Sequence, residues 1–386
     1  MLATGPARMI DFEPADALGQ RVLFTPGPVT CSRTVLEAAT KDVGSWDSDT
    51  TSAVREVCKR LMGYCGDRAD LTTTLIPGSG TYGVESMLAA ALPAGGTVIV
   101  LNNGLYGRRL IEIAKVLGVK VVSVDQAENL RHDPKALDAA LTAHPEATHV
   151  ATCHCETSAG VLNRLDEISP VVAKHGKRLL VDAMASFCGY PVGKGKAIDF
   201  DRDPIDHIVA SANKCAQGIP GISYVISRRS ALEKAAPTRS LSLDLKAQHA
   251  LMDSTGRFRY TPPTHVLLAL QQALRELDAE GGPEKRAARY KENQRLVIER
   301  LGRLGIEPYV TAEHRSHINT TFPYPPAPFT FDAFKDGLKR KGYIIFPQKV
   351  TQVDAFRIGS IGNIGPAEVI GLTNAIADVL GKPRPE

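Results

Sequence analysis

Between residues 71 and 226, short apolar segments alternate with segments whose apolar residues recur at helical spacing, and this alternation strongly limits the possible folds. Strands are predicted at Leu71–Ile76, Thr97–Leu101, Lys120–Val124, His149–Cys153, Arg178–Val181, Ile205–Ala212 and Ile222–Ile226, with helices at Tyr82–Ala91, Tyr106–Leu117, Pro134–Ala143 and Ile168–His175. Strands that alternate with helices imply right-handed crossovers and a mainly parallel sheet covered by helices on both faces. The chain is therefore predicted to be an α/β protein.

The last third of the chain has a different pattern. After a long helix at Val266–Glu280 comes a basic helix at residues 287–304, whose Arg and Lys side chains are interpreted as a solvated face. A smaller α/β unit follows, with strands at Ile318–Phe322 and Tyr343–Phe346 and helices at Phe331–Lys341 and Pro366–Leu380. We expect an N-terminal arm (1–20), a large domain (21–280) whose first part contacts the small domain, and a small C-terminal domain (281–386).

Composition excludes several classes of protein. With 46 basic and 42 acidic residues the net charge is only +4, and no basic motif indicates nucleic-acid binding. No apolar run approaches a membrane span, and no secretory signal is recognised at the N-terminus. The seven cysteines are odd in number, which fits free thiols in a reducing cytoplasm. Cys153-His154-Cys155 lacks the spacing of a structural zinc site, so no metal is expected.

Three predicted strands end in polar residues: Glu156–Gly160, Asp182-Ala183 and Asn213-Lys214. The carboxyl ends of parallel strands meet at one edge of a sheet, so we expect these three segments to face one crevice. Lys214 stands between small residues, which leaves room for a ligand around its amine. A dry pocket or a neighbouring cation would lower its pKa and make it a nucleophile. The alternative is a solvated lysine at a strand end.

Other residues suggest what this crevice binds. Asp182 ends a buried strand and would suit a protonated ring nitrogen; a helix cap or a backbone-bonded aspartate is the alternative. Pro77–Thr81 joins a strand to a helix through glycines, an arrangement that binds phosphate, unless Ser79 or Thr81 simply caps the helix. Tyr106 could stack on a flat ring or be a core aromatic.

Arg357 lies between apolar residues in a predicted strand, where an arginine is rarely left unpaired. Its planar guanidinium suits two-point binding of a substrate carboxylate. A structural salt bridge is the alternative.

Together these segments resemble the fold-type-I, class V pyridoxal phosphate (PLP) aminotransferases over residues 21–380. The residues that carry the resemblance are Phe24–Pro28, Gly78–Tyr82, Asn103–Gly107, His154–Thr157, Val181–Met184, Ser211–Cys215, Arg239–Leu245, Pro263–His265 and Phe356–Gly359. Ser211–Cys215 and the Ser-Leu-Ser-Leu-Asp-Leu segment at 240–245 are most similar to the branch that uses 2-aminoethylphosphonate and pyruvate. Transamination between these two compounds is the implied activity, with an alanine- or serine–glyoxylate aminotransferase, or a PLP-dependent lyase, as alternatives.

The resemblance also implies residue roles, a cofactor and a partner. Lys214 would form the Schiff base with PLP and Asp182 would face the ring nitrogen. Tyr106 would stack on the ring, and Thr157 would lie near its 3-hydroxyl. The implied phosphate ligands are Ser79, Gly80 and Thr81, with Asn213 also near the cofactor and Thr261 or Thr264 reaching the phosphate from the second subunit of a homodimer. Arg357 would bind the keto-acid carboxylate.

Three features depart from the pattern of the phosphonate branch: Gln348 replaces a usual glycine, Ala159 a common threonine, and Asp182 and Lys214 are 214 − 182 = 32 residues apart. The cations that would hold the phosphonate are not evident; Arg33, Arg239 and Lys349 are candidates.

Overall fold

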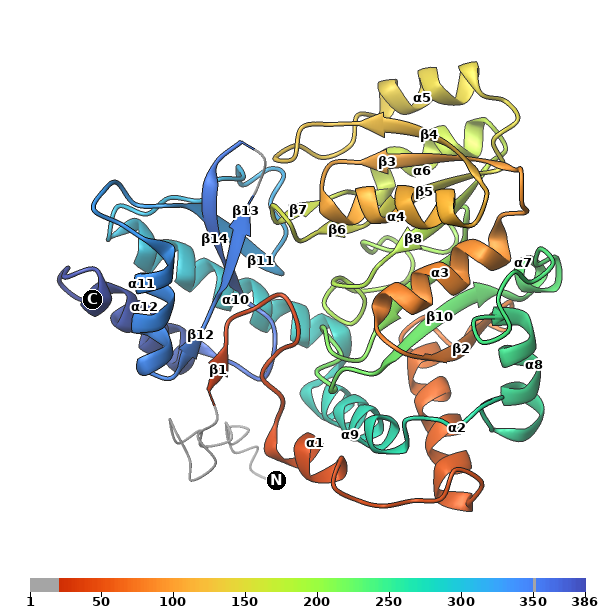
Figure 1. The fold of residues 1–386 in the computed structure, drawn as a ribbon, viewed down its shortest axis with the longest axis horizontal. Helices are drawn as coiled ribbons and strands as arrows, with labels where there is room; N and C mark the ends of the chain where they lie inside the picture. Colours follow the sequence, from red (N-terminus) through yellow and green to blue (C-terminus); the bar gives the residue numbers. More distant parts are fainter. Residues whose placement is uncertain (1–20, 350–351) are drawn as a thin grey trace, which may run out of the picture.

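A computed structural model describes residues 21–349 and 352–386, and it shows two units side by side (Figure 1). The expected arm at 1–20 lies outside the described residues. The strands are β1 (Val22–Leu23), β2 (Leu71–Pro77), β3 (Thr97–Asn102), β4 (Lys120–Asp125), β5 (His149–Cys153), β6 (Cys155–Glu156), β7 (Val161–Leu162), β8 (Arg178–Asp182), β9 (Ile205–Ser211), β10 (Ile222–Arg228), β11 (Asn319–Pro323), β12 (Tyr343–Ile344), β13 (Phe346–Lys349) and β14 (Asp354–Gly359).

The helices are α1 (Arg33–Ala38), α2 (Ser48–Gly63), α3 (Gly80–Ala91), α4 (Leu105–Val116), α5 (Pro134–Ala143), α6 (Leu165–Lys174), α7 (Arg229–Glu233), α8 (Leu245–Thr255), α9 (Thr264–Glu280), α10 (Gly282–Gly302), α11 (Phe331–Arg340) and α12 (Pro366–Val379). Local signals explain several of their ends. For example, α5 begins after Asp133, whose carboxylate accepts a hydrogen bond from the N–H of Lys135, with Pro134 in the first turn.

The larger unit is built on a seven-stranded sheet, within the described residues, with the strand order β2-β10-β9-β8-β5-β3-β4. The five strands from β9 to β4 run parallel, and β10 is antiparallel to both of its neighbours. The prediction of an α/β fold with a mainly parallel sheet is confirmed.

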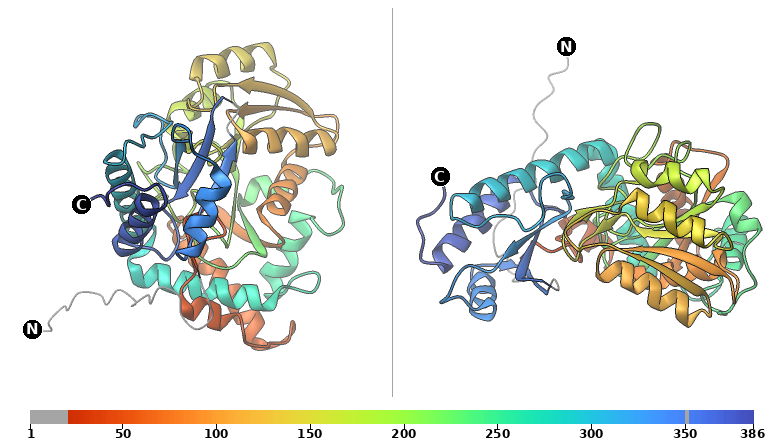
Figure 2. Two further views of the ribbon diagram at one scale, coloured as in Figure 1. Left: turned by 60° about the vertical axis from the view of Figure 1, so that its left-hand side comes forward. Right: turned by 90° about the horizontal axis from the view of Figure 1, so that it is seen from above.

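Helices cover both faces of this sheet (Figure 2). Within β8, Leu180 packs into a core formed with α3, α4 and α7, whereas its neighbours Leu179 and Val181 point to the other face, covered by α2, α5, α6 and α9. Because successive side chains of a strand point to opposite faces, an apolar run such as this one is buried on both sides.

The smaller unit has its own apolar core around Phe322, Phe334 and Phe356, between the β11-β14-β13 sheet and helices α10, α11 and α12. Strand β1 belongs to this core, because it pairs with β12 and contributes Val22. The chain thus enters the smaller unit before it forms the larger one. The domain boundary after residue 280 stays a prediction.

The interpretation of the basic helix as a solvated face is only partly right, because Lys291, Arg295 and Arg303 are exposed but two other arginines are not. In α10, Arg300 is buried and donates hydrogen bonds to Thr373 and Asn374, while Arg289 pairs with Glu280 and donates to backbone carbonyls of the smaller unit. Apolar residues of α10 also enter the core. Long Arg side chains can cross an apolar surface to reach carbonyls that no other group satisfies, so a high count of basic residues does not show that a helix is exposed.

Candidate active site

The carboxyl ends of β5, β8 and β9 lie next to one another and open onto a cavity of about 260 Å³. Parallel sheets of this kind bind ligands beyond these strand ends. The cavity is lined by Ser79, Gly80, Thr81, Val84, Tyr106, Arg109, Cys153, Cys155, Thr157, Asp182, Met184, Ala185, Ser211, Asn213, Lys214 and Pro220. The structure therefore brings together eight residues predicted to form one site: Ser79, Gly80, Thr81, Tyr106, Thr157, Asp182, Asn213 and Lys214.

Lys214 lies in the turn that follows β9, and its amine donates a hydrogen bond of 2.8 Å to the carbonyl oxygen of Pro26. Burial lowers the pKa of Lys214 to about 8, and the Arg357 guanidinium acts in the same direction. A lysine with this pKa has a substantial fraction of neutral amine near neutral pH. The alternative of a solvated strand-end lysine is thus wrong.

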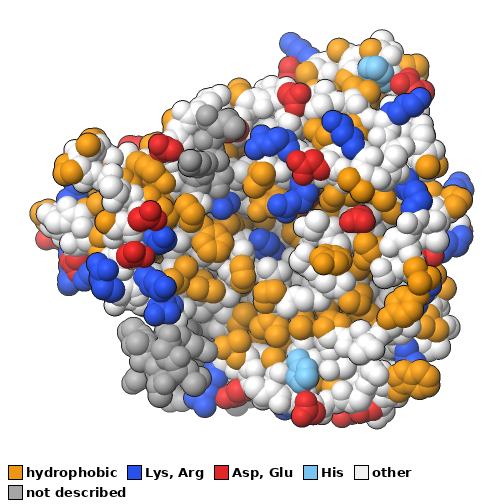
Figure 3. All heavy atoms as spheres, viewed as in Figure 1, with side chains coloured by type: hydrophobic (Ala, Val, Ile, Leu, Met, Phe, Trp, Pro, Cys, Tyr) orange, Lys and Arg blue, Asp and Glu red, His pale blue; other side chains and the backbone are white. Residues whose placement is uncertain are grey.

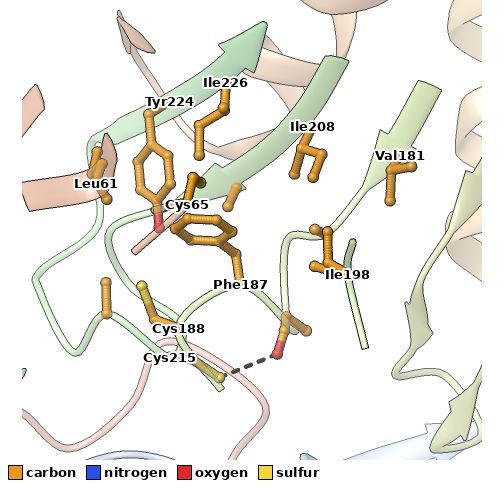
Figure 4. Close-up of a cluster of buried hydrophobic side chains, with 14 of the residues drawn as sticks. Leu61, Cys65, Val181, Phe187, Cys188, Ile198, Ile208, Cys215, Tyr224 and Ile226 are labelled. Atoms are coloured by element: carbon orange, nitrogen blue, oxygen red, sulfur yellow. Dashed lines mark hydrogen bonds between the residues drawn. The ribbon is translucent and has the colours of Figure 1, made fainter. Parts of the chain in front are cut away.

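The backbone beneath Lys214 is fixed by the core. Cys215 is fully buried, donates a hydrogen bond of 3.1 Å to the carbonyl of Ala185, and lies near Cys188 (Figure 4). Phe187 and Tyr224 pack edge to face in the same cluster, with ring centroids 5.7 Å apart (Figure 4). Such packing holds the start of the Lys214 side chain in one place while its amine faces the cavity.

Asp182 is the last residue of β8. One carboxylate oxygen, Oδ1, accepts a hydrogen bond of 2.9 Å from the N–H of Met184, and no hydrogen bond to a described residue is found for the other oxygen. Burial raises the pKa of Asp182 to about 6, opposed by the Met184 hydrogen bond and the positive charges of Lys214 and Arg109. The alternative interpretation, an aspartate bonded to the backbone, is therefore correct for Oδ1, and the other carboxylate oxygen is left for a ligand.

The amino end of α3 forms one wall of the cavity. Ser79 is its N-cap residue, but its hydroxyl makes no capping hydrogen bond, so the alternative in which Ser79 simply caps the helix is wrong. A Cβ atom on Gly80 would lie 2.6 Å from Cε of Met184, so a larger residue there would have to displace the Met184 side chain. Ser79, Gly80 and Thr81 line the cavity, and the free N–H groups at the amino end of a helix can bind an anion.

Tyr106 is positioned by the start of α4. Its N–H and that of Gly107 each donate a hydrogen bond of 3.1 Å to the carboxylate of Glu156. The phenol of Tyr106 interacts with the side chain of Arg357, and the guanidinium of Arg109 lies 5.1 Å from the ring centroid. Tyr106 is half-buried at the cavity wall, so it is not a simple core aromatic.

Arg357 comes from β14 of the smaller unit and reaches two residues of the cavity wall. Its Nη1 donates a hydrogen bond of 2.9 Å to the carbonyl of Thr157, and its side chain interacts with Tyr106. Its buried Nε has no hydrogen-bond partner, and no carboxylate among the described residues forms an ion pair with it. The structural salt bridge considered as an alternative is therefore not observed, and the guanidinium is left for an anionic ligand.

Among the lining residues that the sequence analysis missed, Arg109 and Ser211 offer hydrogen-bond donors to a ligand. Arg109 follows Tyr106 by three positions on α4, which places both on one face of the helix, and this spacing could have revealed it. Ser211 is buried at the end of β9, and its hydroxyl has no partner within the described residues. A buried hydroxyl without a partner is costly, which suggests that a ligand satisfies it.

Other predicted residues do not line this cavity. Thr261 is exposed and Thr264 is the first residue of α9, and neither lines this cavity; their role at the cofactor phosphate from a second subunit stays a prediction. Arg33 is exposed and pairs with Glu37. Arg239 donates hydrogen bonds to the carbonyls of Leu117, Ala89 and Leu92, away from the cavity. The side chains of Lys349 and Gln348 lie outside the described part of the structure.

No group of three or more potential metal ligands is found among the described residues. Cys153 donates a hydrogen bond to the carbonyl of Cys155, and the ring of His154 lies 2.9 Å from the Ser186 hydroxyl. Among the helices of the described chain, none is long and apolar enough to span a membrane.

Comparison with known proteins identifies the family. The Aminotransferase class-V family model matches residues 72–326. The 2-aminoethylphosphonate–pyruvate transaminase 2 of Burkholderia lata is 41% identical over 365 residues, which cover 94% of this chain and 95% of that protein. The 2-aminoethylphosphonate–pyruvate transaminase of Aeromonas hydrophila is 42% identical over 370 residues, which cover 94% and 96%.

A solved structure supports the fold. The crystal structure of alanine–glyoxylate aminotransferase from Nostoc sp. superposes with a TM-score of 0.86 at 24% identity, covering 98% of this chain and all of that one. At this identity the similarity concerns the fold alone.

Proposed function

The chain belongs to the Aminotransferase class-V family, and we propose that it transfers the amino group of 2-aminoethylphosphonate to pyruvate, giving phosphonoacetaldehyde and L-alanine. It is a PLP-dependent aminotransferase. The relatives that cover nearly its whole length act, by name, on these two substrates, and they do not favour the glyoxylate alternative.

The residues of the cavity fit PLP. The unpartnered Ser211 hydroxyl and the amino end of α3, with Ser79 and Thr81, offer hydrogen-bond donors to a phosphate. Asp182 offers a free carboxylate oxygen to a ring nitrogen. Lys214 offers the amine to which the cofactor aldehyde would be joined. Tyr106 offers a flat surface at the wall.

When bound, PLP accepts the electron pair left on the donor carbon after deprotonation and carries the amino group from one substrate to the other. Lys214 moves the protons: its Nζ removes one from the carbon that bears the donor's amino group, and later delivers one to the carbonyl carbon of pyruvate. A pKa of about 8 suits both tasks, because the protonated and neutral amine are then both populated. Asp182 holds a positive charge at the ring nitrogen.

The observation that carries the proposal is that Arg357 donates to the carbonyl of Thr157, a residue of the cavity wall, and lacks a carboxylate partner in the described chain. Its guanidinium also lies close enough to Lys214 to help lower the pKa of that amine. A 2-keto acid has a carboxylate directly beside its reacting carbon. Binding of that carboxylate by Arg357 would bring the keto carbon to the lysine amine.

The cysteines argue against the desulfurase form of the lyase alternative, which needs an exposed reactive thiol. All seven lie in the described chain, none is exposed, and burial raises the pKa of each thiol, to about 12 for Cys31 and Cys58. Seven free thiols also support a reducing compartment, and we include the cytoplasm in the proposal.

The proposal includes a homodimer that completes the site with Thr261 or Thr264 of a second copy. Hydrophobic side chains gather in a band across the face seen in Figure 3. Three large hydrophobic side chains of the described chain are exposed near one another in sequence or contact: Trp46 (75% exposed) has the Arg257 guanidinium over its ring, while Leu241 (73%) and Tyr260 (48%) both lie near Arg259. Large apolar side chains exposed next to the predicted phosphate threonines favour a protein partner there.

The experiment is a donor screen with the PLP-loaded protein and pyruvate, in which L-alanine is measured. 2-Aminoethylphosphonate should give alanine and phosphonoacetaldehyde in equal amounts, and Lys214→Ala should give none while keeping its fold. The proposed substrate would be overturned by a protein that is inactive on 2-aminoethylphosphonate but active with another donor and acceptor, for example one that forms glycine from serine and glyoxylate. Borohydride reduction of the loaded protein should tag Lys214; a tag on a different lysine would remove Lys214 from its role.

A further inference from the structure

Glu156 is a fully buried acid whose two carboxylate oxygens both accept hydrogen bonds. Its Oε2 accepts from the N–H groups of Tyr106 and Gly107, and its Oε1 from the N–H and the hydroxyl of Ser158. Within the described chain no Lys or Arg forms an ion pair with it. Burial raises the pKa of Glu156, whereas the four donors oppose this shift because they favour the ionised form.

Glu156 and Ser158 together accept hydrogen bonds from the first three N–H groups of α4. The N-cap residue Gly104 has no side chain to cap the helix. Instead, the N–H of Leu105 donates to the Ser158 hydroxyl at 3.3 Å, and the next two N–H groups donate to Glu156. The segment from Glu156 to Ser158 therefore caps α4, although Glu156 lies 50 positions after Tyr106 in the chain. A Cβ atom on Gly104 would lie 2.6 Å from Cγ of Glu156, so the close approach requires glycine.

The next residue of the same loop holds the arginine from the smaller unit. The carbonyl of Thr157 accepts hydrogen bonds from Nη1 of Arg357 at 2.9 Å and from Nδ2 of Asn319 at 3.2 Å. Two consecutive residues therefore hold the two groups. The side chain of Glu156 holds the start of α4, which carries Tyr106, and the main-chain carbonyl of Thr157 holds Arg357. Tyr106 and Arg357 also contact each other, so each of the two is linked both to the segment Glu156–Thr157 and to the other.

We propose that Glu156 is a positioning residue, which places Tyr106 against the cofactor ring and, through the Thr157 carbonyl, places Arg357 for the keto-acid carboxylate. The inference rests on the proposed function and adds to it a residue that touches neither substrate nor cofactor. A carboxylate is required at this position because both of its oxygens must accept. In glutamine one oxygen is replaced by an NH₂ group, which would face two N–H donors of α4 or the two donors of Ser158.

The test is Glu156→Gln, which keeps the shape of the side chain and removes its charge. The cofactor dissociation constant, measured by fluorescence titration of the cofactor-free protein, should increase about tenfold because the first turn of α4 moves with Tyr106. The Michaelis constant for pyruvate should also increase about tenfold because Arg357 moves. Unchanged values of both constants, with only a lower melting temperature, would reduce Glu156 to a helix cap and overturn the inference.

A double-mutant comparison separates positioning from general damage. If Glu156 acts on the cofactor through Tyr106, then Glu156→Gln in a Tyr106→Ala background should weaken cofactor binding by less than about twofold more. If instead the double variant weakens cofactor binding by the product of the factors of the two single variants, the two residues act independently, and the inference is contradicted. Should Glu156→Gln fail to fold, Ser158→Ala replaces it, since it removes one donor to Oε1 and the acceptor of Leu105; a weaker increase of both constants, about threefold, is expected.

The matched control is Asp133→Asn, which removes a capping carboxylate from α5 outside the cavity. The amide oxygen of asparagine can still accept the Lys135 hydrogen bond, so this variant should change stability little and leave both constants unchanged. The cofactor titration does not depend on turnover, so it also distinguishes two failures. A wild-type protein that makes no alanine contradicts the proposed function, whereas Glu156→Gln with wild-type cofactor affinity contradicts the positioning role.

Discussion

The side-chain amine of Lys214 donates a hydrogen bond of 2.8 Å to the carbonyl oxygen of Pro26, although the two residues lie 188 positions apart in the chain. Pro26 belongs to the segment that follows β1, and β1 is part of the smaller unit. A segment that leaves the smaller unit therefore holds the lysine of the larger unit. Gly27, the next residue, has φ +120°, and a Cβ atom there would lie 2.6 Å from Nζ and 2.8 Å from Cε of Lys214.

Gly27→Ala is therefore expected to displace the Lys214 side chain. Turnover should fall at least about a hundredfold, the loss that follows from moving a reacting group by about 1 Å. The yield of the borohydride tag on Lys214, measured by mass spectrometry, should fall in parallel.

Gly95→Ala is the control for backbone strain. Gly95 has φ +74°, and no atom lies within 4 Å of the position of its Cβ. Its substitution should cost about 1–2 kcal/mol of stability and leave turnover unchanged. Equal loss of turnover in both variants would mean that strain, and not contact with the lysine, explains Gly27.

Asp182→Asn should stabilise the cofactor-free protein while weakening cofactor binding. The folded-state pKa of about 6 lies above the ordinary value of 3.8, so the folded protein binds this proton more tightly than the unfolded chain does. The resulting stabilisation is complete below pH 3.8 and is lost as the pH rises to about 6, which amounts to at most about 3 kcal/mol. The melting temperature of Asp182→Asn without cofactor should exceed that of the wild type at pH 7.5, by an amount that shrinks toward pH 4.5.

Asp206→Asn is the control of opposite sign. The hydrogen bond from His149 and the charge of Arg178 hold the pKa of Asp206 below its ordinary value, despite its burial. Its ionised form thus stabilises the folded state above the unfolded-state pKa, and its replacement should lower the melting temperature at pH 7.5. If Asp182→Asn, like Asp206→Asn, had a lower melting temperature than the wild type at pH 7.5, the conclusion that the buried Asp182 carboxylate destabilises the cofactor-free protein would be wrong.

Arg357→Lys should raise the Michaelis constant for pyruvate at least about tenfold, or 1.4 kcal/mol, because an ammonium group cannot reproduce two-point binding of a carboxylate. Single-turnover absorbance measurements separate the two half-reactions. If Arg109, which lines the cavity without an ion-pair partner in the described chain, holds the phosphonate, then the constant for the donor should change less. Similar changes in both would indicate that the two substrates share Arg357.

Arg239→Lys is the matched control, because Arg239 also donates to backbone carbonyls but lies away from the cavity. It should destabilise the protein and leave both Michaelis constants within about twofold. A selective effect on the phosphonate donor would restore Arg239 as a phosphonate ligand. An unchanged pyruvate half-reaction in Arg357→Lys would remove Arg357 from the site.

Trp46→Glu combined with Leu241→Glu should dissociate the expected homodimer, because a buried charge in an apolar contact is unfavourable. Sedimentation at micromolar concentration should show monomers with reduced cofactor affinity, since Thr261 and Thr264 of the second copy are then lost. Ile370→Glu, at an exposed apolar residue of α12, should leave the mass unchanged. A wild-type monomer with full activity would contradict the shared site.

Much of the larger unit could be predicted from local patterns. The bounds of α5 and β5 are the predicted ones, and most other elements differ by one to three residues at their ends. Strand and helix periodicities, together with polar residues at strand ends, place Asp182, Asn213 and Lys214 at one edge of the sheet without any knowledge of distant contacts. The sequence by itself thus determined the layer architecture, the edge where the site lies and most of its wall.

Only the tertiary structure decided the relationships between distant segments. The antiparallel direction of β10, the contacts of Arg289 and Arg300 with the smaller unit, the contact of Pro26 with Lys214, and the capping of α4 by Glu156 all depend on how separate segments dock. Periodicity reports which face of an element is buried, but it does not report which group on another element will satisfy a buried polar atom. Arg357 shows the difference: the sequence suggests that it needs a partner, and only the fold shows that a main-chain carbonyl holds it and no carboxylate of the described chain pairs with it.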